Sequence, residues 1–546
     1  MSRGGWRAPW GAGLHAQRRA ASDRWLLRLA LAAAWACLPA AADSPAAEVA
    51  ALHARGETMQ AAQMACAWAA QEPGNLEALR TWGELALQVG MGRRAEEALR
   101  SLVFFAPNDP HGRVLLGRAL LAQGRTSEAR EQLEQAIHLQ PDGAEAYVEF
   151  ARIARLSAAS SGEMLSAAEI AVQIAPRYAP AHAAMGASLR EARRYYEALA
   201  ALEHALELDP RCGDALFELG LTHAVGGAAE QAREAWARLV AVEPHSDRAW
   251  LVRNRLVITA ERALIDRAFD ACYSPDGGRI AYRARGADGW GIYTIGTEGE
   301  PTETLLWSTE VQLQSLSWAP DASALLTVAA GRATVDVRGT EREAATRELV
   351  VIPTDGQGQA RSIMQDAQLG EAGWIPGSGH IGAPGHVRGV GWAILDIDPA
   401  TGSSTRVPGV DPQFIHQFPA WSADGSLLLA VRRTQGAADG GVLYELLVGP
   451  AADFRSARVV FVCDTLPQQS TFARDGAVVV FALPTGQPQA FCVWALPTDG
   501  SRDPVPVDPR AGPLGAISFS PDGGFMLSSR GTRLVRLTLD GLGAEP

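Results

Sequence analysis

The chain has 546 residues, a formal net charge of −12 and an apolar fraction of 47%. A chain of this length exceeds one hydrophobic core, which predicts two or more domains, and the apolar fraction excludes disorder over most of the chain. All 49 basic residues are arginine, which excludes P-loop, Schiff-base and Ser-x-x-Lys chemistry, and the acidic balance argues against nucleic acid and anionic lipid as partners.

Residues 1–42 have the order of a secretory signal peptide. Six arginines and one aspartate precede or flank an apolar run of fourteen residues, 29–42, which ends in small residues before Asp43. The run is shorter than the ~20 residues that cross a bilayer. We therefore predict cleavage near Asp43, export to the periplasm or cell envelope, and a mature net charge near −17.

Cys37 offers an alternative to simple cleavage. The segment Ala34-Trp35-Ala36-Cys37 distantly resembles a bacterial lipobox, so lipid attachment at Cys37 would make the chain an outer-membrane lipoprotein. This is the one route to a membrane that the sequence suggests.

A repeat of about 34 residues organises the chain after the signal segment. Six prolines recur at intervals of 34 or 35 residues, each after a stretch with helical periodicity: Pro73, Pro107, Pro141, Pro176, Pro210 and Pro244. Glycine recurs 24 positions before four of them, at Gly83, Gly117, Gly186 and Gly220. Because glycine weakens a helix interior, its recurrence predicts a close approach between the two helices of each unit.

This pattern resembles the tetratricopeptide repeat. Five clear units cover 76–109, 110–143, 144–178, 179–212 and 213–246, a degraded unit covers 45–75, and 247–256 has the character of a cap helix. The third unit departs from the pattern, with Ala151 in place of glycine and one inserted residue near 157–162. The resemblance implies an α-solenoid over residues 45–258.

Residues after 268 follow a strand pattern instead. Short apolar runs alternate with turns, and Ser274-Pro275-Asp276-Gly277 returns intact at 520–523, with four degenerate copies between them. Three residues before each Asp position stands an aromatic residue: Tyr273, Trp318, Trp374, Trp421, Phe472 and Phe519. We predict that these six side chains fill the gaps between neighbouring sheets.

Six such units at 45 to 56 residue spacing predict a β-propeller, and they resemble the six-bladed propeller of the TolB type. The last unit has only three strand candidates, so residues 257–265 are expected to supply its outer strand and join the two domains stiffly. The fold class is therefore a multidomain α then β chain, a tetratricopeptide α-solenoid followed by a six-bladed β-propeller over 259–546.

Catalytic signatures are missing from the sequence. It contains no Gly-x-Ser-x-Gly and no His-Glu-x-x-His, and His380 and His386 stand without a nearby sequence partner for a metal. We expect no catalytic residue, cofactor or metal. Cys463 and Cys492 lie in apolar strands of consecutive blades, and either buried thiols or a single disulfide fits them.

The sharpest functional hypothesis concerns the concave groove. In tetratricopeptide proteins it is lined by first-helix positions 2, 5, 9, 12 and 13, which here hold Glu77, Arg80, Glu84, His111, Arg118, Glu145, Arg152, Arg155, Arg190, Glu191, Asp214, Phe217 and Leu221. The five arginines would suit a carboxylate or an acidic peptide. Alternatively, they pair with neighbouring glutamates such as Glu84 or Glu149.

The resemblance implies a non-enzymatic interaction scaffold of the bacterial cell envelope. It would bind a peptide or protein partner in the groove and a second partner on the propeller face. Two alternatives remain open: an enzyme or enzyme subunit with a site in the propeller funnel, and a lipid-anchored envelope component.

Overall fold

The computed structural model describes residues 44–542, apart from the short segments 157–160, 287–288, 300–301, 338–339, 356–357, 367–368, 436–441, 464, 474–475, 485–490 and 512–516. The predicted signal segment and Cys37 lie outside the described residues. The inserted residue of the third repeat falls at the undescribed segment 157–160.

The first half consists of helical hairpins. The helices are α2 Pro45–Ala54, α3 Thr58–Gln71, α4 Leu76–Gln88, α5 Gly92–Phe105, α6 Pro110–Leu121, α7 Thr126–Leu139, α8 Ala144–Leu156, α9 Ser161–Ile174, α10 Ala179–Glu191, α11 Tyr195–Leu208, α12 Gly213–Val225, α13 Ala229–Val242 and α14 Asp247–Arg253. They form six pairs and one cap helix, as the 34-residue period predicts. The helix pairing predicted from this period is confirmed in all six units, including the degraded unit at 45–75.

The recurrent glycines allow the close approach predicted for them. A Cβ on Gly83 would lie 2.5 Å from the side chain of Leu99, and a Cβ on Gly117 would lie 3.0 Å from Leu133. Trp236 stands against Gly220 in the same way. A larger residue at these positions would separate the two helices of a hairpin, because packed interiors leave no space to absorb it.

The second half contains six antiparallel sheets of four strands each. Blade 1 contains β2 Ala268–Tyr273, β3 Arg279–Gly286, β4 Gly289–Gly296 and β5 Thr304–Thr309; blade 2 contains β6 Leu313–Trp318, β7 Ala324–Val337, β8 Thr340–Pro353 and β9 Arg361–Asp366; blade 3 contains β10 Gly373–Trp374, β11 Ile381–Val387, β12 Gly391–Ile397 and β13 Ser404–Arg406. Blade 4 contains β14 Ile415–Trp421, β15 Leu427–Gln435, β16 Val442–Pro450 and β17 Arg458–Cys463, with the short helix η1 Phe454–Ser456; blade 5 contains β18 Gln468–Ala473, β19 Val478–Pro484, β20 Phe491–Pro497 and β21 Val505–Ala511; blade 6 contains β22 Ser518–Phe519, β23 Phe525–Arg530, β24 Arg533–Asp540 and β1 Val257–Asp266.

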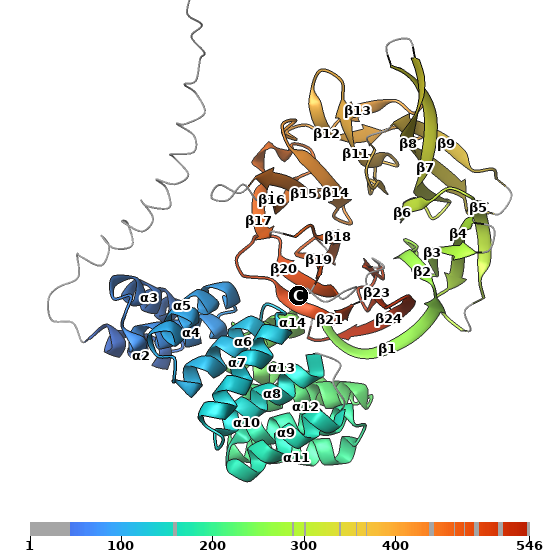
Figure 1. Cartoon of the computed structure of the whole chain (residues 1–546). Helices are drawn as coiled ribbons and strands as arrows, with labels where there is room; N and C mark the ends of the chain where they lie inside the picture. Colours follow the sequence, from blue (N-terminus) through green and yellow to red (C-terminus); the bar gives the residue numbers. More distant parts are fainter. Residues whose placement is uncertain are drawn as a thin grey trace, which may run out of the picture.

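The sheets are arranged radially around one axis, as a six-bladed β-propeller (Figure 1). The ring closes through β1, which pairs antiparallel with β24 from Val257 opposite Asp540 to Asp266 opposite Arg533. The prediction that residues 257–265 supply the missing outer strand is confirmed. The strand begins at Val257, just before the boundary expected at residue 259.

The six aromatic residues lie between neighbouring blades, as predicted. Trp318 of blade 2 donates its indole N–H to the carbonyl of Cys272 in blade 1, and Trp421 of blade 4 covers Gly382 of blade 3. The intact turns also have the expected chemistry, since Asp276 accepts hydrogen bonds from the Ser274 hydroxyl and the Gly278 amide.

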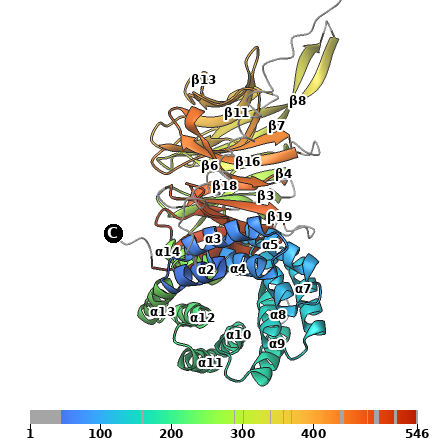
Figure 2. The same ribbon diagram turned by 90° about the vertical axis from the view of Figure 1, so that its left-hand side faces the viewer.

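The helical array contacts the propeller at its last helix, near its first helices, and at the turn between α6 and α7, where Gly124 lies against Trp494 of β20. At its end, Trp250 of α14 packs in the same apolar cluster as strands of blades 5 and 6. Near its beginning, Arg93 of α5 donates to the carbonyl of Val462 and lies over the ring of Phe461. Figure 2 shows the array as an arc whose early helices and final helices both lie beside the propeller.

Candidate functional site

Charged side chains from successive first helices meet along the inner side of the array. They come from α4, α6, α8, α10, α12 and α14, and we call them the charge ladder: Glu84, His111, Arg118, Glu145, Glu149, Arg152, Arg190, Glu191, Asp214, Glu218 and Arg248. Ion pairs join α4 to α6, α6 to α8, α8 to α12, α10 to α12 and α12 to α14, so the ladder includes residues of all five clear units and the cap helix.

The structure places four of the five predicted arginines in ion pairs. Arg80 lies 2.7 Å from Asp109, Arg118 lies 3.5 Å from Glu149, Arg152 lies 2.9 Å from Asp214, and Arg190 lies 3.1 Å from Glu218. The side chain of Arg155 lies outside the described residues. These four side chains therefore pair with carboxylates, as the alternative prediction had it. Such pairing does not exclude that the same side chains also contact a partner.

Asp214 is the most heavily shared carboxylate of the charge ladder. It accepts from Arg152 of α8 and forms a second ion pair with Arg248 of α14. Burial alone would raise the pKa of Asp214, but the guanidinium groups of Arg248 and Arg152 hold it well below its usual range. The aspartate is therefore ionised at every pH at which the protein is handled, and it ties the third unit to the cap helix.

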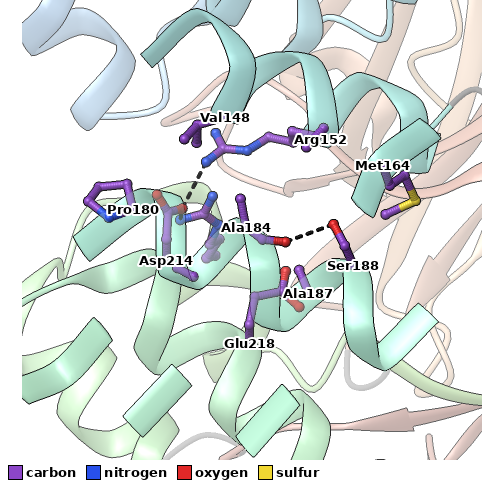
Figure 3. A pocket seen from close by; sticks show the side chains of 12 residues that line it. Val148, Arg152, Met164, Pro180, Ala184, Ala187, Ser188, Asp214 and Glu218 are labelled. Atoms are coloured by element: carbon purple, nitrogen blue, oxygen red, sulfur yellow. Dashed lines mark hydrogen bonds and ion pairs between the residues drawn. The ribbon is translucent and has the colours of Figure 1, made fainter. Parts of the chain in front are cut away.

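A small hollow lies beside Asp214 and opens to solvent. Figure 3 shows Arg152 reaching across it to Asp214, with Met164 and the alanines of α10 on its other sides. The apolar part of the lining comes from Val148, Ala151, Met164, Pro180, Ala183, Ala184 and Ala187. The hydroxyl of Ser188 is already bonded to the carbonyl of Ala184, so the polar character of the hollow comes from the charge ladder.

His111 joins the first three units. Its Nδ1 lies 2.8 Å from Glu145 and its Nε2 lies 3.2 Å from Glu84. Hydrogen bonds to Glu145 and Glu84 raise the pKa of His111 to about 9. The imidazole is therefore protonated at neutral pH and acts as a cation of the ladder.

We expect this histidine to make the stability of the array depend on pH. Its folded pKa is above the unfolded value, so its contribution is complete below pH ~6.5 and is lost as the pH rises through ~9. Thermal unfolding followed by circular dichroism at pH ~7 and ~9.5 should show a smaller decline for His111→Gln than for the native chain. His138→Gln, at an exposed position of α7, is the matched control, and an equal decline in all three chains would contradict the assignment.

The sequence did not single out Glu218 and Arg248 of the charge ladder, nor Asp109 beside it. Arg248 stands at position 2 of the cap helix, 34 residues after Asp214, so the repeat register did carry a signal for it. Asp109 precedes α6, where its carboxylate accepts from the His111 amide as a helix cap while also binding Arg80.

A second cluster lies on the axis of the propeller. Asp270 accepts from Arg283 at 2.6 Å and from Gln469 at 3.1 Å. Gln469 belongs to blade 5 and Asp270 to blade 1, which are not neighbours in the ring, so these side chains meet across the centre. Glu371 of blade 3 lies near the same group, where the Asp270 carboxylate raises its pKa and the guanidinium groups of Arg283 and Arg347 lower it.

These axial residues occupy one repeated position, three residues before the inter-blade aromatic. The position holds Asp270, Ser315, Glu371, Phe418 and Gln469. All but Glu371 have positive φ, between 41° and 53°, at a bulge of the innermost strand. Bulges of this kind redirect side chains and are common beside functional sites. Burial raises the pKa of Glu371 to about 7, and the nearby Asp270 carboxylate acts in the same direction.

The described residues contain neither a grouped set of metal ligands nor a membrane-spanning helix. Among the described residues, no three His, Cys, Asp or Glu side chains are grouped as metal ligands would be, and His380 lies instead 2.7 Å from Asp396. None of the described helices has the length and apolar character of a membrane span. Cys463 and Cys492 share one apolar cluster between blades 4 and 5, and burial raises the pKa of the Cys492 thiol.

The family comparison concerns the helical half. A family model described as tetratricopeptide repeat matches residues 80–144, 114–180 and 184–249. Residues 80–249 are tetratricopeptide repeats. The charge ladder therefore lies on first helices of these repeats and on α14. Before the match, α2 and α3 form a further helix pair, and α14 follows α13 as a single cap helix.

Several solved structures resemble parts of this chain. TolB from Acinetobacter baumannii is 17% identical, with 50% of this chain and 54% of that chain covered and a TM-score of 0.34. Putative TolB from Agrobacterium tumefaciens is 16% identical, with coverages of 51% and 91% and a TM-score of 0.36. MamA from Desulfovibrio magneticus RS-1 is 21% identical, with coverages of 31% and 95% and a TM-score of 0.24. No match to a curated protein sequence was found.

Proposed function

We propose that this chain is a non-enzymatic interaction scaffold, exported to the periplasm or cell envelope after removal of residues 1–42. In this proposal residues 45–258 bind a peptide or protein partner in the concave groove, and residues 259–546 present a second partner surface on the propeller. The single observation that carries the proposal is the charge ladder with its adjoining hollow, which lies on the inner face of the tetratricopeptide array.

The groove is also held in one shape before a partner arrives. The array is fixed to the propeller at α14 and again at α5, so its curvature is not free to open. Binding to a preorganised groove avoids much of the entropy cost of ordering. We propose Arg80, Arg118, Arg152, Arg155 and Arg190 as the residues that face the partner. The prediction of an acidic partner rested on these arginines alone, and the carboxylates beside them reduce the attraction for a negative ligand.

A display library of peptides screened against immobilised residues 43–546 tests the proposal. Peptides recovered from the native chain should bind Arg118→Gln at least about tenfold more weakly, a loss of about 1.4 kcal/mol. Arg233→Gln, which changes an exposed ion pair on α13, should leave binding unchanged. Failure to recover any peptide, or equal binding to both variants with unchanged circular dichroism, would remove the groove from the proposal.

A specific observation favours the enzyme alternative as a second candidate. The axial cluster brings Asp270 and Glu371 together with two arginines, and Glu371 has a pKa near neutrality, which suits a general acid or base. The third candidate, a lipid-anchored component, depends on Cys37. The mass of the mature N-terminal peptide decides it, because an acylated Cys37 and an unmodified Asp43 differ in both position and mass.

A further inference from the structure

The two ends of the helical array meet at one turn of the propeller. Figure 2 shows α14 and the early helices on the same side of the array, beside the propeller. A Cβ on Gly90, in the turn between α4 and α5, would lie 2.7 Å from the carboxylate of Asp247, the first residue of α14. The first clear unit and the cap helix are therefore direct neighbours in space, although they lie far apart in the sequence.

Arg502, in the turn between β20 and β21, holds the cap helix. Its guanidinium forms an ion pair with Asp247 and lies over the ring of Trp250, 5.2 Å from the ring centroid. Only 10% of the Arg502 side chain is exposed. Gly90 lies against the same guanidinium, and a Cβ at this position would collide with it. Because Gly90 has no side chain, the arginine can lie between the last helix of the array and its first clear unit.

The next residue, Asp503, holds the beginning of α5. Its carboxylate accepts a hydrogen bond of 3.3 Å from the amide of Arg93, in the first turn of that helix. The first amides of a helix have no partner within the helix, and the helix dipole favours a negative charge beside them. Met91, the N-cap residue of α5, makes no such bond with its side chain. The propeller therefore supplies a cap that the array's own N-cap residue does not provide.

We infer that Arg502 and Asp503 form a clasp that joins the two ends of the array, so that the shape of the groove is set from the propeller. The clasp is close to the groove, because Asp247 is followed directly by Arg248, which pairs with Asp214 of the charge ladder. This inference goes beyond the proposed function, since it concerns how the array is held. Its consequence for affinity rests on the proposed function.

Hydrogen exchange of residues 43–546, followed by mass spectrometry, tests the clasp without any partner. Arg502→Gln removes the ion pair with Asp247, and the amides at the start of α5 should then exchange at least about fivefold faster, as should those of α14. Asp503→Asn removes the charge beside α5, and α14 should respond by a similar factor, because coupling between two sites is reciprocal. Asp499→Asn, at an exposed position of the same turn whose carboxylate accepts from the Ser501 amide, is the matched control and should leave both ends unchanged.

A steric variant tests the clasp independently of charge. Gly90→Ala places a methyl group against the guanidinium of Arg502, and the amides of α14 should exchange at least about fivefold faster. Gly56→Ala is the matched control, because Gly56 holds the same turn position in the degraded unit, with φ 80° against 70° at Gly90, and a Cβ there has no neighbour within 4 Å. Both variants carry the cost of a side chain in the left-handed conformation, so the difference between them reports the contact with Arg502.

The outcomes separate the clasp from the proposed function. Changes confined to α14 in Arg502→Gln and to α5 in Asp503→Asn, or equal effects of Gly90→Ala and Gly56→Ala on α14, overturn the clasp while leaving the groove as a binding site. Faster exchange at both ends, with no peptide recovered by the native chain, supports the clasp and counts against the proposed function.

The affinity of the groove supplies the last measurement. Peptides recovered from the native chain should bind Arg502→Gln at least about fivefold more weakly, because loosening the ends displaces the charge ladder. Unchanged affinity in a variant whose two ends exchange faster would overturn the inference that the propeller sets the shape of the groove.

Discussion

Replacing Asp214 by alanine is expected to lower the free energy of unfolding of the helical array by about 3 to 5 kcal/mol. The reason is that Asp214 neutralises both Arg152 and Arg248, and its removal leaves two guanidinium groups in a largely buried position without that partner. Chemical unfolding by urea, followed through the helical circular dichroism signal, measures the change.

The comparison variant for this prediction is Asp266→Ala. Asp266 forms an ion pair with Arg533 that is largely exposed to solvent on both sides, so its loss should leave the unfolding midpoint essentially unchanged. Equal effects of the two substitutions would mean that the ion pairs of Asp214 contribute no more than a surface pair. Asp214→Asn, which keeps the shape but not the charge, should fall between the native chain and the alanine variant.

Replacing Glu371 by glutamine is expected to stabilise the propeller at alkaline pH. The pKa of Glu371 is raised from 4.5 to about 7 by burial and by the neighbouring Asp270 carboxylate. The folded state therefore holds the proton more tightly than the unfolded state, and stability falls as the pH rises from about 4.5 to 7. Glutamine has no proton to lose, so the variant should be more stable by about 2 to 3 kcal/mol at pH ~8 and equal to the native chain at pH ~4.

Thermal unfolding at the two pH values, followed by tryptophan fluorescence, checks the prediction. Glu298→Gln is the control, because Glu298 lies exposed in the turn after β4 and should not alter the pH profile. A native chain whose stability does not decline between these pH values would contradict the placement of Glu371 in the axial cluster. The result also bears on the enzyme alternative, because a neutral carboxyl at the axis is what that alternative requires.

Much of the fold could be predicted because its two halves repeat local packing rules. The glycine of each helical hairpin contacts a leucine or tryptophan only about sixteen residues away, as Gly83 does with Leu99 and Gly220 with Trp236. The six aromatic residues likewise recur once in each propeller repeat. The last repeat has only three strand candidates, which indicated that its outer strand comes from elsewhere in the chain. Patterns of this kind involve residues that are close together in the sequence, so they can be recognised without knowledge of the tertiary structure.

Other features could not be predicted, because they depend on where distant segments meet. Nothing in the repeat register indicates that Arg93 of α5 contacts Val462 of β17, more than three hundred residues later. The left-handed conformation of Asp270 and Gln469 is similarly a product of the crowded propeller axis. Arg193 is a third case, since it holds at φ 61° the turn position that glycine occupies at Gly90 and Gly124.

The groove illustrates how much of a surface charge can be predicted from residue types alone. Five arginines at groove positions predict a cationic surface, and the four whose side chains are described form ion pairs with carboxylates. The charge that a ligand meets depends equally on Glu149, Asp214 and Glu218, each of which pairs with an arginine of another repeat. A sequence pattern lists which charges face a surface, but the pairing between repeats decides how much of that charge a ligand experiences.

The helical array is attached to the propeller near both of its ends, at α5 and at α14. A solenoid attached at one end only can change its superhelical pitch with temperature and load. Attachment at α5 as well as at α14 removes that freedom. Blades 4, 5 and 6 together then determine the spacing of the repeats. Substitution of Arg502, which lies against the ring of Trp250, or of Phe461, which lies against Arg93, should therefore change the affinity of the groove for its partner. Neither residue lines the groove.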